Sequence, residues 1–243
     1  MSDVLSLNGI VISSMPMGEN DRRIVLLTKE RGKISAFARG ARKSKSPISA
    51  ATNPFAFGTF QAFEGRNSYT VVNAEVKRYF DGLSKDYDAI CLASYFLEIA
   101  EYFSGENIDE SERLNLIYLS LAALESKTFD SKLIRRIYEL RTLKINGEYP
   151  NVFSCIKCGK TENMHRYDTR AMGMVCDSCQ DDKNSSISIS QDLLYVLQFV
   201  LSCDMKKLFS FKLKEDLFNE FDNFMRMYWN RNIDHAFKSE RFL

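Results

Sequence analysis

Cys155-Ile-Lys-Cys158 and Cys176-Asp-Ser-Cys179 are two C-x-x-C pairs separated by seventeen residues, and they decide how the last third of the chain folds. A tight turn lets two thiolates reach one ion, and a second hairpin can bring the other two to it. Gly159 follows the first pair, where the turn past the second ligand favours a positive φ. The spacing predicts one tetrahedral zinc ion held by Cys155, Cys158, Cys176 and Cys179.

Four cysteines would close the coordination shell of this zinc. A catalytic zinc keeps one position open for water, so we expect a structural ion. Two disulfides or four free thiols are the alternatives, and no secretory signal is visible at the N-terminus to favour disulfides. His165 is a further candidate ligand, although an ordinary surface histidine is the favoured interpretation of it.

Helical patterns flank the cysteines on both sides. Apolar residues repeat at helical spacing upstream, and the last of these helices is expected from about Asp130 to Ile145, ending at Asn146-Gly147. Helices resume at Ser190–Leu201, with Ser190 as N-cap, and near Glu215–Asn230. This predicts a helical domain of residues 81–150 and 184–243, interrupted by a zinc-finger insert of residues 151–183.

Residues 1–80 have the pattern of strands, with no clear long helix. Met15-Pro16-Met17-Gly18 is expected to end the first strand, and Gly40–Pro54 is expected to be a loop. Two hairpins are expected around Gly32 and Gly65. The five predicted strands are Val4–Ser13, Arg23–Thr28, Ile34–Arg39, Phe55–Phe63 and Ser68–Val76. Short strands in this number favour an OB-fold barrel, which makes the chain a multi-domain α+β protein.

Charge is distributed unevenly along the chain. Residues 1–80 hold twelve Lys/Arg and six Asp/Glu, a net charge of +6, whereas the remainder holds 21 and 26, a net charge of −5. A basic domain on an acidic body suggests a polyanionic partner. No stretch approaches the length of a membrane span, and the cysteine usage fits a reducing, cytoplasmic setting.

The basic residues of the predicted barrel are candidate nucleic-acid contacts. Alternation places Ser35, Phe37 and Arg39 on one face of their strand, so Phe37 could stack on a base and Arg39 could bind a phosphate. Phe37 as barrel core is the favoured alternative. The loop after Arg39 could clamp a strand without reading its sequence. The candidate set is Arg22, Arg23, Lys33, Phe37, Arg39, Arg42, Lys43 and Lys45.

A stripe along the helix that ends at Ile145 is a candidate peptide site. Arg141 lies among apolar residues there, and a cation beside an apolar groove would suit a peptide that is acidic and ends in a carboxylate. Arg141 paired with a buried glutamate, or reaching to water, is the favoured alternative. The candidate residues are Ile134, Arg135, Tyr138, Arg141 and Lys144.

No motif in the chain indicates catalysis. The two histidines are far apart, with no H-E-x-x-H or H-x-E context, and no Gly-rich nucleotide loop or nucleophile elbow is present. A zinc deaminase is disfavoured because four cysteines close the shell and no glutamate or histidine base lies near them. We therefore expect a protein that is not an enzyme.

Several segments, in order, resemble the RecO family of bacterial recombination mediators. They are Gly18-Glu19-Asn20-Asp21-Arg22, Thr28-Lys29-Glu30-Arg31-Gly32-Lys33, Arg39-Gly40-Ala41-Arg42-Lys43, Gly147-Glu148-Tyr149-Pro150 before the first cysteine pair, and the ending Lys238-Ser239-Glu240-Arg241-Phe242-Leu243. One departure is Met172-Gly173, where many relatives have two glycines. The resemblance extends over essentially the whole chain.

The resemblance implies an OB-fold, a helical domain and a zinc finger. It implies binding to single- and double-stranded DNA, annealing of complementary strands, and a place on the bacterial nucleoid. The implied protein partners are RecR, the acidic C-terminal tail of single-strand-binding protein and, indirectly, RecA, which would be loaded on coated DNA. An assembly scaffold whose basic barrel meets an acidic protein rather than DNA is the alternative.

Overall fold

The computed structural model describes residues 4–66, 68–180 and 185–243. The chain divides into two compact units, residues 1–131 with 236–243, and residues 132–235. These units do not coincide with the three domains expected from the sequence, whose boundaries stay a prediction. The expected boundary at residues 183 and 184 lies outside the described residues.

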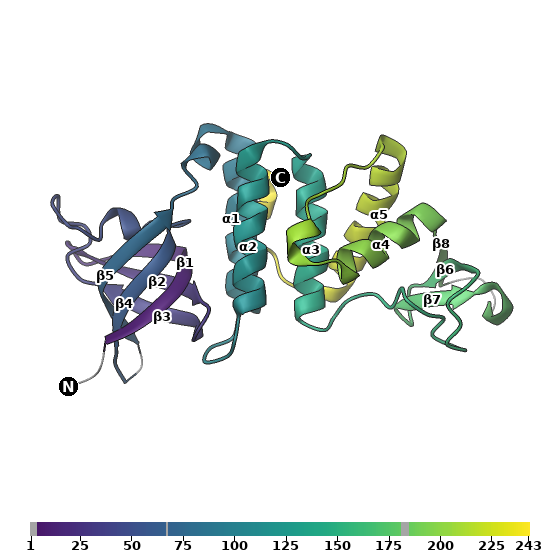
Figure 1. The fold of residues 1–243 in the computed structure, drawn as a ribbon, viewed down its shortest axis with the longest axis horizontal. Helices are drawn as coiled ribbons and strands as arrows, with labels where there is room; N and C mark the ends of the chain where they lie inside the picture. The colour runs from purple at the N-terminus through teal and green to yellow at the C-terminus, as the bar shows by residue number, and fades with distance from the viewer. Residues whose placement is uncertain (1–3, 67, 181–184) are drawn as a thin grey trace. The chain divides into compact units, whose positions relative to one another are not determined.

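The first unit contains a closed five-stranded barrel (Figure 1). Its strands are β1 (Val4–Met17), β2 (Asp21–Thr28), β3 (Gly32–Ala38), β4 (Phe57–Glu64) and β5 (Tyr69–Arg78). They close in the order β1-β2-β3-β5-β4, with β3 and β5 parallel and the other pairs antiparallel. The barrel confirms the expected OB-like fold and both hairpins.

Strand β1 is longer than expected, because it continues through Met15, Pro16 and Met17. Only its first half, Val4–Ile10, pairs with β4. Its second half pairs with β2 alone, so one side of it is a free edge, where a proline costs no ladder hydrogen bond. A register shift between Val11 and Ser13 bends the strand between these two halves. The expected break at Pro16 was wrong for this reason.

Two helices and the end of the chain complete the first unit. Helix α1 (Tyr87–Phe103) begins at Asp86, whose carboxylate accepts the Ala89 N–H at 3.2 Å. Helix α2 (Ser111–Ser126) packs against α1 and β2. The C-terminal 3-10 turn Lys238–Phe242 returns to α1, where Ser239 donates two hydrogen bonds to the Glu98 carboxylate.

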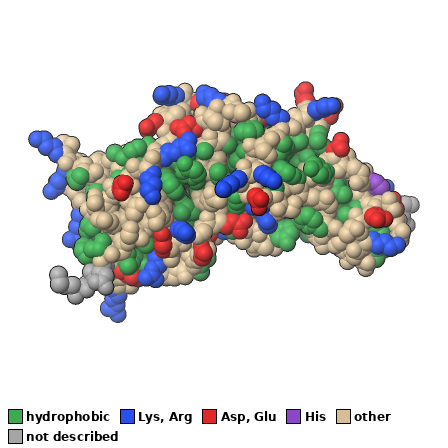
Figure 2. All heavy atoms as spheres, viewed as in Figure 1, with side chains coloured by type: hydrophobic (Ala, Val, Ile, Leu, Met, Phe, Trp, Pro, Cys, Tyr) green, Lys and Arg blue, Asp and Glu red, His purple; other side chains and the backbone are tan. Residues whose placement is uncertain are grey.

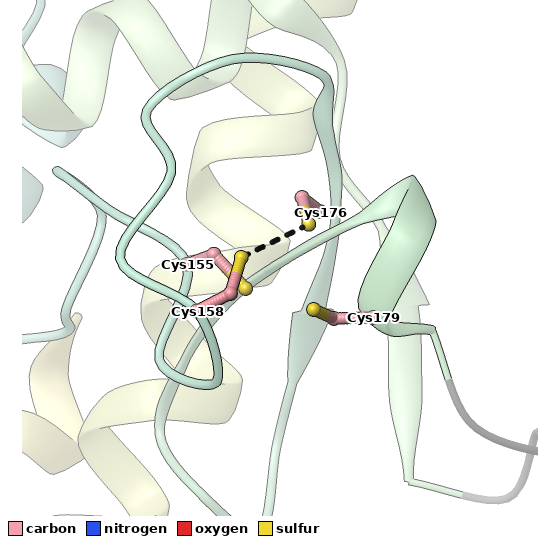
Figure 3. Close-up of side chains that lie close together, drawn as sticks. All are labelled: Cys155, Cys158, Cys176 and Cys179. Atoms are coloured by element: carbon pink, nitrogen blue, oxygen red, sulfur yellow. Dashed lines mark hydrogen bonds between the residues drawn. The ribbon is translucent and has the colours of Figure 1, made fainter.

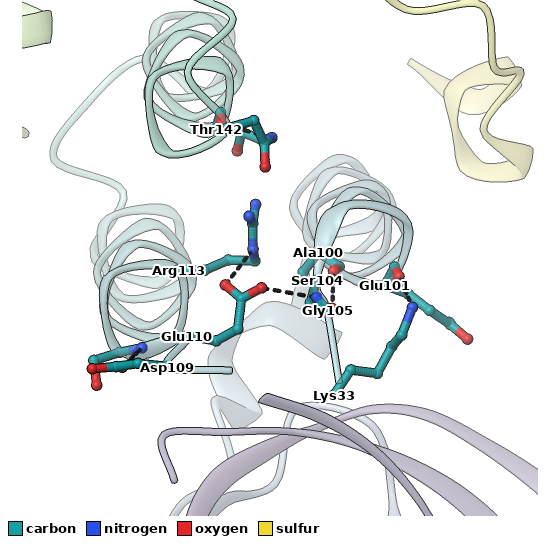
Figure 4. A network of polar contacts seen from close by, with 11 residues as sticks. Lys33, Ala100, Glu101, Ser104, Gly105, Asp109, Glu110, Arg113 and Thr142 are labelled. Atoms are coloured by element: carbon teal, nitrogen blue, oxygen red, sulfur yellow. Dashed lines mark hydrogen bonds and ion pairs between the residues drawn. The ribbon is translucent and has the colours of Figure 1, made fainter. Parts of the chain in front are cut away.

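The turn between β2 and β3 is fixed to the loop between α1 and α2. The Lys33 N–H donates to the Gly105 carbonyl at 2.7 Å, and the Asn107 N–H donates to the Arg31 carbonyl at 2.9 Å. In that loop the buried Glu110 carboxylate binds the Arg113 guanidinium and the Gly105 N–H (Figure 4). The start of β3 therefore has a fixed position relative to α1.

The second unit combines three helices with a small sheet. The helices are α3 (Ser131–Ile145), α4 (Gln191–Ser202) and α5 (Glu215–Asn232). The sheet has the order β7-β6-β8, from β7 (Gly173–Cys176), β6 (Met164–Asp168) and β8 (Ser186–Ser188). The helices lie where the sequence predicted them, and Ser190 caps α4 by accepting the Leu193 N–H. Across the described part of the chain, no helix is both long and apolar enough to span a membrane.

Candidate nucleic-acid interface and metal centre

The outer face of β2 and β3 carries three of the predicted contacts, Arg23, Lys33 and Phe37. Ile34, Ala36 and Ala38 point into the barrel, so Ser35 and Phe37 point outward, and Phe37 is half-buried there. The alternative that placed Phe37 in the barrel core was wrong. Arg23 lies directly beside Phe37 in the ladder and donates to the Ser35 hydroxyl at 3.3 Å.

A groove of about 510 Å³ runs along this face. It is lined by Arg23, Lys33 and Ser35 of β2 and β3, by Arg66 after β4, and by the acidic side chains of Glu64 and Glu106. Arg66 is not among the contacts predicted from the sequence. Its place in the turn between the fourth and fifth strands was the available signal, because OB-folds bind oligonucleotides with that loop.

The basic loop after β3 is fixed to the turn between β1 and β2. The Gly40 N–H donates to the Asp21 carboxylate at 2.7 Å, and Arg42 donates from its N–H to the Asn20 carbonyl and from its guanidinium to the Gly18 carbonyl, both at 2.9 Å. Gly40 has φ +67°, which only glycine adopts freely. The backbone of the loop therefore has a defined position.

Arg39, Lys43 and Lys45 are exposed at this end of the barrel. Within the described residues, their side chains make no hydrogen bond or ion pair. Figure 2 shows Lys and Arg side chains projecting at the left edge of the view, over the loop that follows β3 in Figure 1. These cations are available to an anionic partner.

Besides Arg42, two further predicted contacts bind other residues of the protein. The Arg22 guanidinium donates to the side chains of Thr52 and Asn53, and so holds the segment before β4. The Lys33 ammonium donates to the Glu101 carbonyl at 2.7 Å, near the C-terminus of α1 (Figure 4). A cation is favourable there because the last carbonyls of a helix lack backbone partners.

The four cysteines converge in space as the sequence predicted (Figure 3). Their sulfurs lie within 4.8 Å of one another, and the Cys158 and Cys176 sulfurs are 3.6 Å apart. A tetrahedral ion with bonds of about 2.3 Å needs sulfurs about 3.8 Å apart, whereas a disulfide needs about 2.05 Å. Gly159 has the expected positive φ of +75°. The cluster could hold a metal ion.

The electrostatics differ within the cluster, because hydrogen bonds with Cys158 and Cys176 raise the pKa of the Cys179 thiol to about 12 whereas that of Cys155 is lowered. Burial alone would raise the pKa of the Cys155 thiol, but hydrogen bonds from the backbone of Cys176, Lys157 and Cys158 lower its pKa to about 6. A thiolate held by N–H groups is the form that binds a metal. His165 is turned to a different partner, since its Nδ1 lies 3.1 Å from the Asp177 carboxylate.

The stripe on α3 is largely enclosed. Ile134, Tyr138 and Arg141 are buried, whereas Arg135 and Lys144 are partly exposed. The Arg141 guanidinium donates to the carbonyls of Val200, Leu201 and Cys203 at 3.1 to 3.3 Å. Arg141 therefore caps the C-terminus of α4, which neither of the two sequence-based interpretations anticipated.

A shallow apolar groove in the second unit was not found from the sequence. It has a volume of about 380 Å³ between α4 and the segment before α5. Tyr195 stacks on Phe199, whose ring meets Phe211 edge-on at 5.2 Å. Lys212 is at its edge, and Lys206, Lys207 and Lys214 are exposed in the same segment. The signal was the run of lysines between aromatic residues.

Comparison with known proteins places the chain in a family. The family profile described as Recombination protein O N terminal matches residues 1–80, and that described as Recombination protein O C terminal matches residues 84–241. The DNA repair protein RecO of Acetivibrio thermocellus is 33% identical over 242 residues, covering 98% of this chain and 96% of its own. That of Alkaliphilus metalliredigens is 29% identical over 234 residues, covering 96% and 95%. The chain belongs to the RecO family.

Proposed function

We propose that this protein is a DNA-binding recombination mediator that acts in DNA repair in the bacterial cytoplasm, without catalysing a reaction. The observation that carries the proposal is a set of exposed cations, Arg39, Lys43 and Lys45. The backbone of their loop has a defined position at one end of an OB-like barrel. Flexible cations on a fixed loop bind phosphates without selecting a sequence. Arg22, Lys33 and Arg42 are assigned to holding this surface in place.

The proposed mechanism is local competition on coated DNA. The barrel would hold a strand while the second unit holds the tail of single-strand-binding protein, which weakens the contacts between coat and DNA. With RecR bound through the barrel, RecA could then load on the released strand. Because the same binding contacts only phosphates, the bases of two complementary strands would stay free to pair and anneal.

Annealing of complementary strands coated with single-strand-binding protein from the same bacterium tests this function. Changing Arg39, Lys43 and Lys45 to glutamate should slow annealing about tenfold or more, because several phosphate contacts become repulsive. Lys77 and Lys85, which are also exposed in the first unit, changed to glutamate give the control. Undiminished annealing by the loop variant contradicts the assignment.

The alternative is a scaffold whose basic barrel binds an acidic protein. Fluorescence anisotropy with a single-stranded oligonucleotide separates the two. A DNA-binding barrel loses affinity steeply from low to moderate salt, because bound phosphates release counterions. A scaffold shows no measurable binding to the oligonucleotide at either salt concentration.

We propose zinc as the metal of the four cysteines, in a structural role. Four thiolates in tetrahedral arrangement suit zinc, and an ion there would tie the two cysteine turns together. Protein purified without added metal should contain about one zinc per chain by ICP-MS. A Cys176→Ala protein should lose the zinc and the stability of the second unit. Zinc well below one equivalent in the wild type contradicts the proposal.

We propose that the second unit binds the acidic, apolar tail of single-strand-binding protein. The α3 stripe remains the site expected from the sequence, but Arg141 already binds the end of α4. The groove beside Tyr195 is supported by its open apolar floor and the neighbouring lysines, which complement an acidic peptide.

Two charge-reversed proteins separate these sites. One carries Lys207→Glu and Lys212→Glu, beside the groove, and the other carries Lys144→Glu, on α3, which leaves the ion pair of Arg135 with Glu139 intact. Binding of a labelled tail peptide should fall only in the first if the groove is the site. A loss confined to the second protein returns the assignment to α3.

A further inference from the structure

Two methionines lie in the row of residues that crosses the outer face of the barrel. Met15 on β1 is directly opposite Arg23 on β2, Arg23 is opposite Phe37 on β3, and Phe37 is opposite Thr70 on β5. Side chains directly opposite in a ladder point to the same face, about 5 Å apart. Met17, two residues after Met15, points to this face as well.

Met15 and Met17 are exposed by 51% and 45%, although they are on a regular strand. Further along the same face of β2, Val25 and Leu27 are buried. The outer face is therefore covered near the helices and uncovered at the methionines. Large apolar side chains in an uncovered cluster indicate a surface that is covered by a ligand.

Charge at this end of the barrel indicates what the ligand is. Arg23 is part of the row, and the basic loop with Lys43 and Lys45 is held beside Met17 through the bond from the Gly40 N–H to Asp21. Acidic groups at this end include Asp21, whose carboxylate is used in that bond, and Glu19, exposed in the turn. Glu64 and Glu106 line the groove beside Arg23. The ligand should combine apolar faces with negative charges, as an unpaired nucleic-acid strand does.

We propose that Met15 and Met17 contact the base faces of a single DNA strand whose phosphates are bound by Arg23, Lys43 and Lys45. The inference rests on the proposed function and adds the residues that distinguish a single strand from a duplex. Base faces are stacked away inside a duplex, which would meet only the cations. Methionine is unbranched and polarizable, so it adapts to any base and gives no sequence preference.

A strand without bases tests the contact directly. Wild type and the Met15→Ser, Met17→Ser double variant are titrated with a thymidine oligonucleotide, with an abasic strand of equal length, and with a blunt duplex. The variant should bind the thymidine strand on the order of fivefold more weakly per lost base contact. Its affinity for the abasic strand and for the duplex should equal that of the wild type, and its salt dependence should be unchanged.

Val4→Ser is the matched control, since Val4 is 50% exposed on the same strand at its other end. Equal losses on all three ligands, or the same loss in the control, would show that the methionines affect the fold and would overturn the inference. Wild-type affinity of the double variant for the thymidine strand overturns it while leaving the proposed function intact. Failure of the wild type to bind any strand removes the proposed function and the inference together.

Discussion

The basic loop of the barrel and helix α3 are both rich in cations, yet the two sets have opposite surroundings. Lys43 and Lys45 are exposed, with no partner in the described residues. On α3, Arg136 lies between the carboxylates of Glu139 and Asp222, at 2.8 and 2.7 Å. Arg141 binds three carbonyls of α4 and its cap.

The difference shows that cation density alone does not identify a binding surface. A cation with buried partners stabilises the fold, and its removal leaves an unpaired charge inside the protein. A cation without a partner has kept its hydration and its side-chain freedom, and it can exchange both for a phosphate. The loop is therefore the surface that we propose for DNA binding, whereas the α3 network, the ion pairs of Arg136 with Glu139 and Asp222, is part of the second unit's structure.

The largest expected effect comes from breaking the α3 network at Glu139. This side chain is fully buried, and it binds Arg135 and Arg136 at 2.8 Å each. Burial alone would lower the pKa of Arg136, but Glu139 and Asp222 hold it above its usual value, so the arginine stays charged. Glu139→Gln should destabilise the second unit by about 3–5 kcal/mol, measured by urea unfolding.

Glu215→Gln on α5 is the control for this variant, because Glu215 is exposed. Single-strand affinity of Glu139→Gln should match that of the wild type under conditions in which both are folded. An unchanged unfolding midpoint would mean that the ion pairs of Glu139 do not stabilise the second unit. A loss of DNA affinity without a loss of stability would mean that α3 belongs to the binding surface. Either result would remove the contrast with the loop.

Local patterns were sufficient for features whose partners are close in sequence. The cysteine spacing predicted the cluster, because each pair is one turn, and Gly159 has the φ that such a turn requires. Alternation in β3 correctly separated Phe37 from Ala36 and Ala38. It did not say which face is inside. The interior already holds large residues such as Phe60, and Ala36 of β3 leaves room for them.

Features that depend on distant partners could not be predicted. Arg141 is about sixty positions from the carbonyls it binds, and no residue pattern in its own helix indicates them. Lys33 likewise reaches Glu101, on a helix that follows the barrel. Met15 and Met17 were interpreted as a strand break because Pro16 lies between them. That β1 has a free edge there follows only from where β4 ends.

A smaller effect is expected from neutralising the loop cations. Each phosphate contact contributes about 0.7 to the slope of log affinity against log salt for a single strand. Lys43→Gln with Lys45→Gln should therefore reduce that slope by about 1.4, with no change in thermal stability. Lys77→Gln with Lys85→Gln should leave the slope as it is. An unchanged slope in the loop variant would mean that these lysines are as uninvolved in DNA binding as the α3 arginines.

The smallest effect tests an intermediate case, a cation that is exposed but paired. Lys127 is 60% exposed and lies 2.6 Å from the Asp86 carboxylate at the start of α1. Lys127, and then the Ala89 N–H, hold the pKa of Asp86 below its usual value. The bonds of Asp86 therefore stabilise the fold above the carboxyl's unfolded pKa of about 3.9, and this stabilisation is lost as pH falls through the lower, folded pKa.

Lys127→Gln should raise the pKa of Asp86 part of the way back, since the Ala89 N–H remains, and NMR titration of the carboxyl measures the change. Lys85→Gln removes another exposed charge, next to Asp86 in the sequence, and should leave that pKa almost unchanged. Equal shifts in the two variants would mean that Lys127 acts only through its general charge. Exposure, rather than the presence of a partner, would then decide which cations of this protein are free to bind DNA.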